Sequence, residues 1–471
     1  MKILARLIQI VLICIPVGIM GWLLNQWFVP SGVFVVLHEV GENSSFIDEL
    51  KPESRLEDMT ENENKEMTQA IVGDPAYFFI HPHRDFKKAT VEVWFQNQTL
   101  PIVEMGGLTQ LNPDVYDLQP LHNRIIDESS WDRIDENGYV LLQKEKQYDS
   151  LQAFFQDPPS RDRVGVYKTT LDLPYRMEGY TATQTIQTLD VSLRGQHEFK
   201  TYLKDEPLSF SLYFMDMNRD EGEDVIRATV FNEEGLPVTE ARFADDGNTS
   251  NDGVVDLGLK RLDLQASSLD EGVYKVVLNT TRDIFFRKIE TTQQKVVFVN
   301  AVFVGDEVGY REPWKGAKLY TESKYLRFQT RHAEGVQTLT AGTSQVNIAQ
   351  PYEWYGVSIR EKGLQEVSVP TGDVEVVTSG LFAFSPTQYF NPDLVALNAY
   401  TTLDNLDVDY VLAKYTSPRQ EGDWLVATLS VPTEGLHAEE DGTWKFSFST
   451  PFIEELHGRL VIHQIHAWLY R

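Results

Sequence analysis

Cysteine is almost absent from this sequence. Among 471 residues the single cysteine is Cys14, which lies in an apolar N-terminal stretch. The remaining chain therefore has no disulfide and no thiolate metal site. Export is still compatible with this composition, because a large β-sandwich has a sufficient core without disulfides.

Positive charge is also scarce. Lys and Arg number 42 against 70 Asp and Glu, which gives a net charge of −28 and a pI near 4.7. A field of that sign repels phosphate backbones, so we expect no nucleic-acid partner. The acidic surface is compatible with the collection of divalent cations.

Catalytic motifs are missing as well. The chain has no G-x-S-x-G, no H-E-x-x-H, no P-loop and no dinucleotide fingerprint between a strand and a helix. Glycoside hydrolysis needs only two carboxylates, and the abundance of Asp and Glu makes any chosen pair uninformative. We therefore predict a non-enzyme with no catalytic residue, and a carbohydrate-active enzyme remains the alternative.

One long apolar run is present at the N-terminus. Residues Leu7 to Leu24 carry no charge, and the apolar character continues to Val29. About 20 such residues span a hydrocarbon core of roughly 30 Å. Lys2 and Arg6 precede the run, so the positive-inside rule predicts a cytoplasmic segment 1–6, an anchor at 7–29 and an extracytoplasmic body. A cleaved signal peptide and a buried core helix are the alternatives, although we find no clean cleavage site.

After Leu24 the chain shows strand periodicity and no long helical period. Leu208, Phe210, Leu212 and Phe214 alternate with polar residues, and Trp444–Ser449 alternates in the same way. Turn signals recur at the spacing typical of sandwiches. We predict an all-β protein with one transmembrane helix followed by two or three antiparallel β-sandwich domains of the jelly-roll or Ig-like kind.

Composition places the expected domain boundaries in sequence order. Residues 30–70 are expected to form a strand and an acidic stalk, 71–185 a first β-rich domain, 186–293 a second sandwich and 294–471 a C-terminal jelly-roll-like sandwich. Locally, Asn137-Gly138 predicts a hairpin turn. Residues 149–156 predict a short helix that buries Leu151, Phe154 and Phe155.

Two stretches carry a resemblance to known modules. Leu193 to Val238 resembles strands and loops of bacterial jelly-roll or Ig-like envelope modules, and Trp444 to Leu469 is similar to the closing strands of galactose-binding-type jelly rolls. The resemblance implies a sandwich fold and permits glycan binding. It brings no catalytic motif, and a fold does not imply a function.

An acidic loop is the candidate for a calcium site, and no other cofactor is expected. Asp216, Asn218, Asp220 and Asp224 offer the oxygen ligands that Ca²⁺ prefers. An EF-hand would need glycine where Glu221 stands, so a solvated acidic loop is the favoured alternative. His81 and His83 would share a face in an extended chain, but no third zinc ligand is evident nearby.

Aromatic residues offer a hypothetical glycan site. Trp314, Tyr352 and Trp354 lie in loop-like segments beside charged residues. Exposed aromatic rings stack on sugar rings, whereas the same residues also fill cores and loop corners. Core or corner is the expected place for most aromatic residues of this chain.

The predicted function is surface display, adhesion or glycan contact by a membrane-anchored extracytoplasmic protein. The expected partners are the membrane, through residues 7–29, and glycans or other envelope proteins. Besides a tethered carbohydrate-active enzyme, the alternative is an accessory subunit of an envelope, pilus or secretion complex that uses sheet edges to bind strands of its partners.

Overall fold

The computed structural model describes residues 14–23, 32–217, 222–244, 258–305, 316–406 and 408–471. Residues 14–23 are helical. In these ranges no helix combines the length and the apolar character needed to cross a membrane. The rest of the expected anchor, 7–13 and 24–29, lies outside the described residues.

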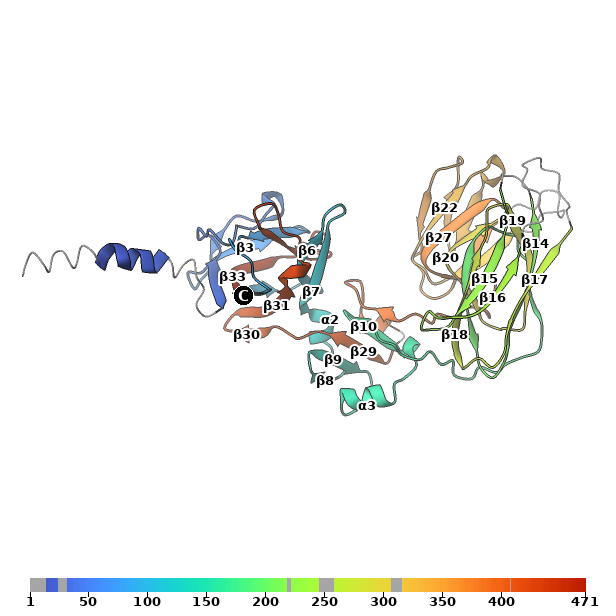
Figure 1. The fold of residues 1–471 in the computed structure, drawn as a ribbon, viewed down its shortest axis with the longest axis horizontal. Helices are drawn as coiled ribbons and strands as arrows, with labels where there is room; N and C mark the ends of the chain where they lie inside the picture. The colour runs from blue at the N-terminus through green and yellow to red at the C-terminus, as the bar shows by residue number, and fades with distance from the viewer. Residues whose placement is uncertain (1–13, 24–31, 218–221, 245–257, 306–315, 407) are drawn as a thin grey trace, which may run out of the picture. The chain divides into compact units, whose positions relative to one another are not determined.

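The fold is all-β, with several antiparallel sheets in two compact units. Unit 1 comprises Met1–Asp157, Arg163–Leu171 and Val395–Arg471, and unit 2 comprises Pro158–Asp162 and Asp172–Leu394. The contiguous boundaries expected at 186 and 294 do not coincide with these units. The reason is long-range pairing, because the last strands of the chain join the first ones in unit 1 (Figure 1).

A sandwich of two sheets forms the main part of unit 1. The longest strand, β33, pairs with β5 on one edge and with β1 and β3 on the other. The larger sheet has the order β2-β3-β33-β5-β31-β30, with strands at Thr60–Glu61, Met67–Ile71, Leu460–Tyr470, Lys88–Asn97, Trp424–Pro432 and Arg419–Glu421, and with β1 at Val33–Glu39. The second sheet has the order β4-β32-β6-β7, with strands at Ala76–Ile80, Trp444–Ser449, Ile102–Gln110 and Val115–Asn123.

The sandwich core follows the alternation of its strands. Val91, Val93 and Phe95 of β5 are fully buried, and they belong to the same core as Phe446 and Phe448 of β32. The segment expected to be an acidic stalk belongs to this sandwich instead. It contributes β2 and β3 and buries Ile47 and Leu50, because apolar residues recur among its acidic ones.

A smaller mixed sheet completes unit 1. Its order is β28-β10-β29-β9-β8, with strands at Val395–Ala396, Val164–Tyr167, Tyr410–Lys414, Tyr139–Gln143 and Asp132–Glu136. The Asn137-Gly138 turn between β8 and β9 is confirmed, with both residues at positive φ. Helix α3 (Leu151–Gln156) buries Leu151 and Phe154 as predicted, but Phe155 is exposed. Helix α2 spans Arg124–Asp127.

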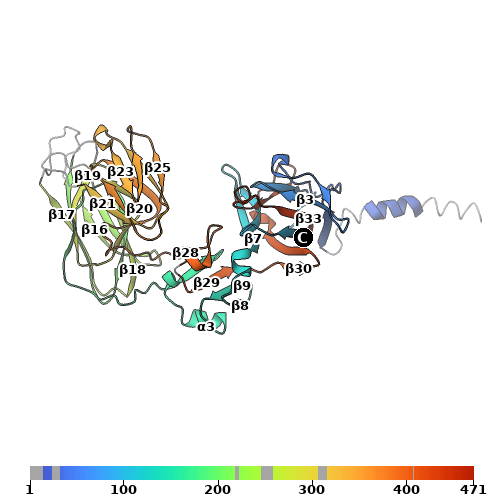
Figure 2. The same cartoon turned by 180° about the vertical axis from the view of Figure 1, so that it is seen from behind.

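Unit 2 combines a large branched sheet with a four-stranded one (Figure 2). The main path of the large sheet is β16-β15-β18-β13-β20-β12-β19-β14-β17. A branch leaves this path at β20 and has the order β20-β27-β22-β25. Strand β11 pairs with β19. One apolar core spans both sheets. The strands β11 to β20 lie at Gln187–Leu189, Leu193–Arg194, His197–Leu203, Leu208–Asp216, Ile226–Phe231, Pro237–Phe243, Lys260–Ala266, Gly272–Asn279, Ile284–Thr291 and Val296–Val304.

The remaining strands of unit 2 follow in sequence. Strands β21 (Ala317–Thr321), β26 (Gln365–Val369), β23 (Thr338–Ala341) and β24 (Ser344–Asn347) make the four-stranded sheet. The branch of the large sheet contains β22, β25 and β27 at Tyr325–Thr330, Tyr355–Ser358 and Val374–Phe382. Short 3-10 helices lie at Glu53–Arg55, Arg161–Arg163, Ala333–Gly335, Leu403–Asn405 and Thr433–Gly435.

Candidate functional site

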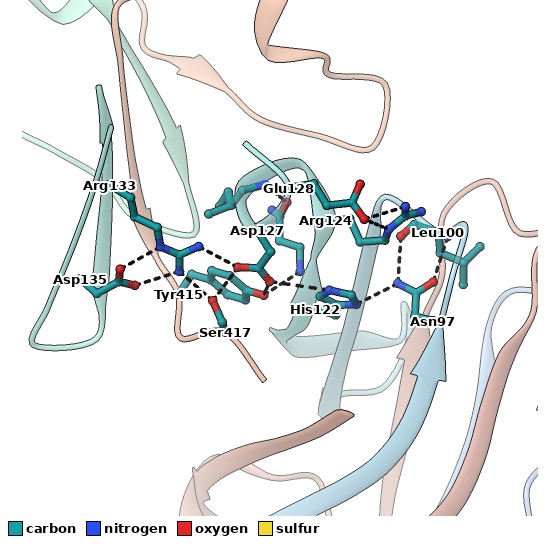
Figure 3. Close-up of polar contacts among 12 residues, drawn as sticks. Asn97, Leu100, His122, Arg124, Asp127, Glu128, Arg133, Asp135, Tyr415 and Ser417 are labelled. Atoms are coloured by element: carbon teal, nitrogen blue, oxygen red, sulfur yellow. Dashed lines mark hydrogen bonds and ion pairs between the residues drawn. The ribbon is translucent and has the colours of Figure 1, made fainter. Parts of the chain in front are cut away.

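A polar cluster of unit 1 is centred on Asp127, the last residue of α2 (Figure 3). Its carboxylate accepts hydrogen bonds from the hydroxyls of Tyr415 and Ser417, the latter at 2.5 Å, and from Nη1 of Arg133 at 3.0 Å. Nε2 of His122 lies 3.7 Å away. The carboxylate therefore links α2 to β8 and to the segment that follows β29.

His122 extends this Asp127 cluster toward the sandwich. Nδ2 of Asn97 donates to Nδ1 of His122 at 3.1 Å, which leaves the imidazole proton on Nε2, facing Asp127. Burial lowers the pKa of His122, and the nearby Asp127 opposes that shift without reversing it. The imidazole is therefore neutral at neutral pH.

The geometry of the Asp127 cluster excludes a serine–histidine–aspartate mechanism. In such a triad the nucleophilic hydroxyl is hydrogen-bonded to the imidazole. Here Ser417 donates to Asp127 instead, so the carboxylate lies between the hydroxyl and His122. Burial raises the pKa of the Tyr415 hydroxyl, and Asp127 raises it further. The cluster is thus a satisfied structural junction.

Unit 1 has a cavity of about 550 Å³, and the ring of Tyr167 in its lining lies 6.5 Å from the ring of Tyr415. Its walls are mostly apolar, and its carboxylate, Glu104, accepts from the Tyr167 hydroxyl at 2.7 Å and pairs with Lys168 at 3.1 Å. Glycoside hydrolysis uses two carboxylates that flank the bond. The described lining offers one carboxylate, already paired with a cation, so the cavity does not favour the enzyme alternative.

Metal ligands gather in one place among the described residues. His332, Glu334 and Asp373 in unit 2 bring potential ligand atoms within 4.8 Å of one another. However, Nη1 of Arg194 donates to Nε2 of His332 at 3.0 Å and lies 3.8 Å from Asp373. A permanent cation therefore already occupies the electrostatic position that a metal would need.

The predicted calcium loop is described in part. Asn218 and Asp220 lie outside the described residues, whereas Asp216 and Asp224 are buried, each 5% exposed. Asp224 accepts a hydrogen bond from the Thr281 hydroxyl. The fully buried guanidinium of Arg287 lies 3.7 Å from the sulfur of Met217, next to Asp216. Calcium binding at this loop stays a prediction.

His81 and His83, the two histidines considered for a zinc site, have different hydrogen-bond partners. His81 contacts Asp48 and Thr443, both at 2.9 Å, whereas Nε2 of His83 lies 3.0 Å from the Ser45 carbonyl. His83 has a φ of 56°, so this segment is not extended. The two rings lie 6.3 Å apart, and no further histidine or acid joins both in the described structure.

An exposed aromatic face lies on β22 and on the turn that leads into β25 in unit 2. Tyr325 and Arg327 share the outward face of β22, because Leu326 and Phe328, which alternate with them, are fully buried. Arg327 is paired with Gly356 in the register and lies over the ring of Trp354 at 5.0 Å. The exposed Tyr352 lies two residues before Trp354, and its amide donates to the Thr330 carbonyl at the end of β22 at 2.8 Å. We call Tyr325, Arg327, Tyr352 and Trp354 the aromatic face.

Glycine makes room for this face. A Cβ atom on Gly356 would lie 2.3 Å from the Tyr325 hydroxyl and 3.0 Å from its Cζ. The Tyr325 ring therefore lies across the backbone of β25 and is still 55% exposed. Trp354 is 43% exposed, whereas Trp424 and Trp444 are buried. The rings of the face are accessible to solvent.

The predicted glycan residues fall partly on this face. Tyr352 is 72% exposed at a φ of 65°, and Trp354 is stacked on Arg327, whereas Trp314 lies outside the described residues. Sequence reasoning missed Tyr325, Arg327 and Gly356. The available signal was the alternation in KYLRFQT, which places Tyr325 and Arg327 on one strand face.

Comparisons with known proteins identify no family. No protein-family model matches the chain, and no curated protein matches it. Among solved structures, a T=1 particle derived from infectious bursal virus shares 8% identity, covers 93% of this chain and 76% of that chain, and has a TM-score of 0.18. The VP2 subviral particle of infectious bursal disease virus shares 8% identity with coverages of 93% and 79% and a TM-score of 0.16. Such low scores carry no argument about fold or function.

Proposed function

We propose that this protein is a non-enzymatic display protein whose unit 2 contacts glycans through the aromatic face. The observation that carries the proposal is the exposed stack of Arg327 on Trp354, with Tyr325 lying across Gly356 on the same outward surface. Accessible aromatic rings offer apolar faces to sugar rings. Arg327 and the exposed Glu353 supply donors and acceptors for hydroxyl groups.

The proposal includes an N-terminal membrane anchor at 7–29 with the body outside the cytoplasm. Its support is the uncharged run from Leu7 to Leu24 together with Lys2 and Arg6. Membrane fractionation and N-terminal sequencing of the mature protein test it. A mature chain that begins near Ser31 and is free of membranes would contradict the anchor.

A glycan array probed with the full chain tests the glycan contact. The expected result is binding that is lost when Tyr325, Tyr352 and Trp354 are all changed to alanine. The matched control is Tyr400→Ala, because Tyr400 is an exposed tyrosine of unit 1, 81% exposed. A variant with Trp314→Ala tests the remaining predicted residue separately.

Two outcomes contradict the glycan proposal. The first is an array on which the unmodified chain binds no glycan. The second is equal binding by the triple variant and by the Tyr400→Ala control.

A further inference from the structure

The first strand of unit 1, β1, forms an open edge of its sheet. Among the described strands it pairs with β33 alone, over all seven residues from Val33 to Glu39. Two backbone hydrogen bonds fix the phase of this ladder. The amide of Arg471 donates to the carbonyl of Gly32 at 2.9 Å, and the amide of Val40 donates to the carbonyl of His463 at 3.0 Å.

This phase decides which backbone groups face away from β33. In an antiparallel pair, directly opposed residues alternate between hydrogen-bonded and non-hydrogen-bonded pairs. Since Gly32 and Val40 bond to β33, the even-numbered residues of β1 face that strand. The N–H and C=O groups of Val35 and Leu37 therefore face the open edge.

The side chains at this edge are apolar and accessible. Val35 is 46% exposed and Leu37 is 64% exposed, both on the outer face of the sheet. Natural edge strands are usually protected by lysine, proline or a bulge. The sequence VFVVL at 33–37 contains none of these. An open edge that is apolar over Val33–Leu37 is a template for another strand.

We propose that β1 pairs with β1 of a second copy of this chain, antiparallel and centred on Val36. In that register Val35 lies opposite Leu37 of the second copy. The outward groups of these two residues then exchange both backbone hydrogen bonds. On the outer face, Val35 and Leu37 of both copies form one continuous apolar row.

Charge favours this antiparallel arrangement and selects a second copy as the occupant. One end of β1 is acidic, with exposed Glu39 and Glu42, whereas the exposed Arg471 lies at the other end, where its amide bonds to Gly32. A two-fold axis through Val36 places the acidic end of each copy beside the basic end of the other. A parallel pair would place like charges together, which is unfavourable.

The pairing is tested with the full chain in detergent micelles. One arm measures which cysteine variants form a disulfide with each other, and the other measures whether the chain is a dimer. In a Cys14→Ser background, one preparation carries Val35→Cys and another carries Leu37→Cys. Mixed preparations are expected to form a disulfide between the two variants, because opposed Cα atoms lie about 5.5 Å apart. Either variant alone places its cysteines at the diagonal distance of about 7–8 Å and is expected to form little disulfide.

A charge substitution supplies the second arm of the test. Sedimentation should show a dimer of the unmodified chain, and Leu37→Lys should raise its dissociation constant about tenfold or more. Leu456→Lys is the matched control, because Leu456 is also an exposed leucine of unit 1, 48% exposed. This control should leave the dissociation constant unchanged.

Three results would overturn the proposal. They are a monomeric unmodified chain, a dimer that Leu37→Lys leaves intact, and disulfide formation that does not prefer the mixed pair. A monomer whose Val35 and Leu37 amides are protected from hydrogen exchange would show that a segment of the same chain covers the edge, and it would reject the second copy as the occupant.

Discussion

The Asp127 cluster of unit 1 and the aromatic face of unit 2 use the same kinds of side chain in opposite ways. Each combines an arginine with aromatic residues. In the cluster, Arg133 and the Tyr415 hydroxyl are directed at one carboxylate, and His122 is buried. On the face, Arg327 stacks on Trp354, and the rings are exposed. The comparison teaches that solvent access, and not residue type, separates a junction from a binding surface.

The largest expected effect is the loss of the Asp127 carboxylate. Asp127→Ala removes the shared acceptor of Tyr415, Ser417 and Arg133, so it should lower the free energy of unfolding of unit 1 by about 3–4 kcal/mol. Urea unfolding followed by hydrogen exchange of unit 1 peptides measures this change. Asp135→Ala is the control, because Asp135 is 57% exposed and pairs with the same arginine; it should cost less than about 1 kcal/mol. Equal losses would show that Asp127 is not the centre of the junction.

A pH effect on stability should be measurable in unit 2. Nε2 of the buried His197 accepts from the Phe303 amide at 3.1 Å, and its Nδ1–H donates to the Gly195 carbonyl at 3.0 Å. Burial lowers the pKa of His197 from 6.5 to about 4. The unfolded chain binds this proton first, so the stability from the neutral imidazole is present above pH 6.5 and is lost as the pH falls toward 4.

The size of this loss follows from the pKa difference. The neutral imidazole should contribute about 3 kcal/mol to the free energy of unfolding of unit 2 above pH 6.5. This follows from about 1.4 kcal/mol for each unit of pKa difference between the unfolded and folded states. Urea unfolding at pH 7 and pH 4 measures it, and His197→Gln should remove this part of the pH dependence. The exposed His83→Gln serves as the control. An unchanged slope in His197→Gln would contradict the prediction.

Gly356→Ala should damage the aromatic face without unfolding unit 2. The added Cβ would meet the Tyr325 ring, so the ring must move off β25. Loss of one aromatic contact of about 1 kcal/mol should raise the dissociation constant for the glycan roughly fivefold. Calorimetric titration with the best glycan of the array measures it. Gly435→Ala, where a Cβ would meet nothing within 4 Å, should leave binding intact.

The smallest expected effect is on stability at the aromatic face itself. Tyr352→Ala and Trp354→Ala remove exposed rings, so each should change the free energy of unfolding of unit 2 by less than about 0.5–1 kcal/mol. Urea titration checks this. A loss near that of Asp127→Ala would mean that the face supports the fold, and the contrast between the two regions would fail.

Several local features could be predicted because their causes are local. The alternation of Leu208, Phe210, Leu212 and Phe214 gave β14, and Asn137-Gly138 gave the β8–β9 turn. The prediction that Phe155 is buried was wrong. A helix shorter than two turns has few inward positions, and the neighbouring Phe154 occupies one of them. The alternation of a strand can also be interrupted, as by the register shift between Ile462 and Gln464 in β33.

The sequence by itself determined the all-β class, most strand positions and the acidic, cysteine-poor character of this protein, because periodicity, turn residues and charge are local properties. Only the tertiary structure decided the two units, the convergence of His122, Asp127 and Tyr415, and the open edge of β1. These depend on strand partners far apart in the chain, as in the pairing of Val33 with Tyr470. Side-chain periodicity determines which face of a strand is buried, whereas the choice of partner depends on how the whole chain buries its apolar surface.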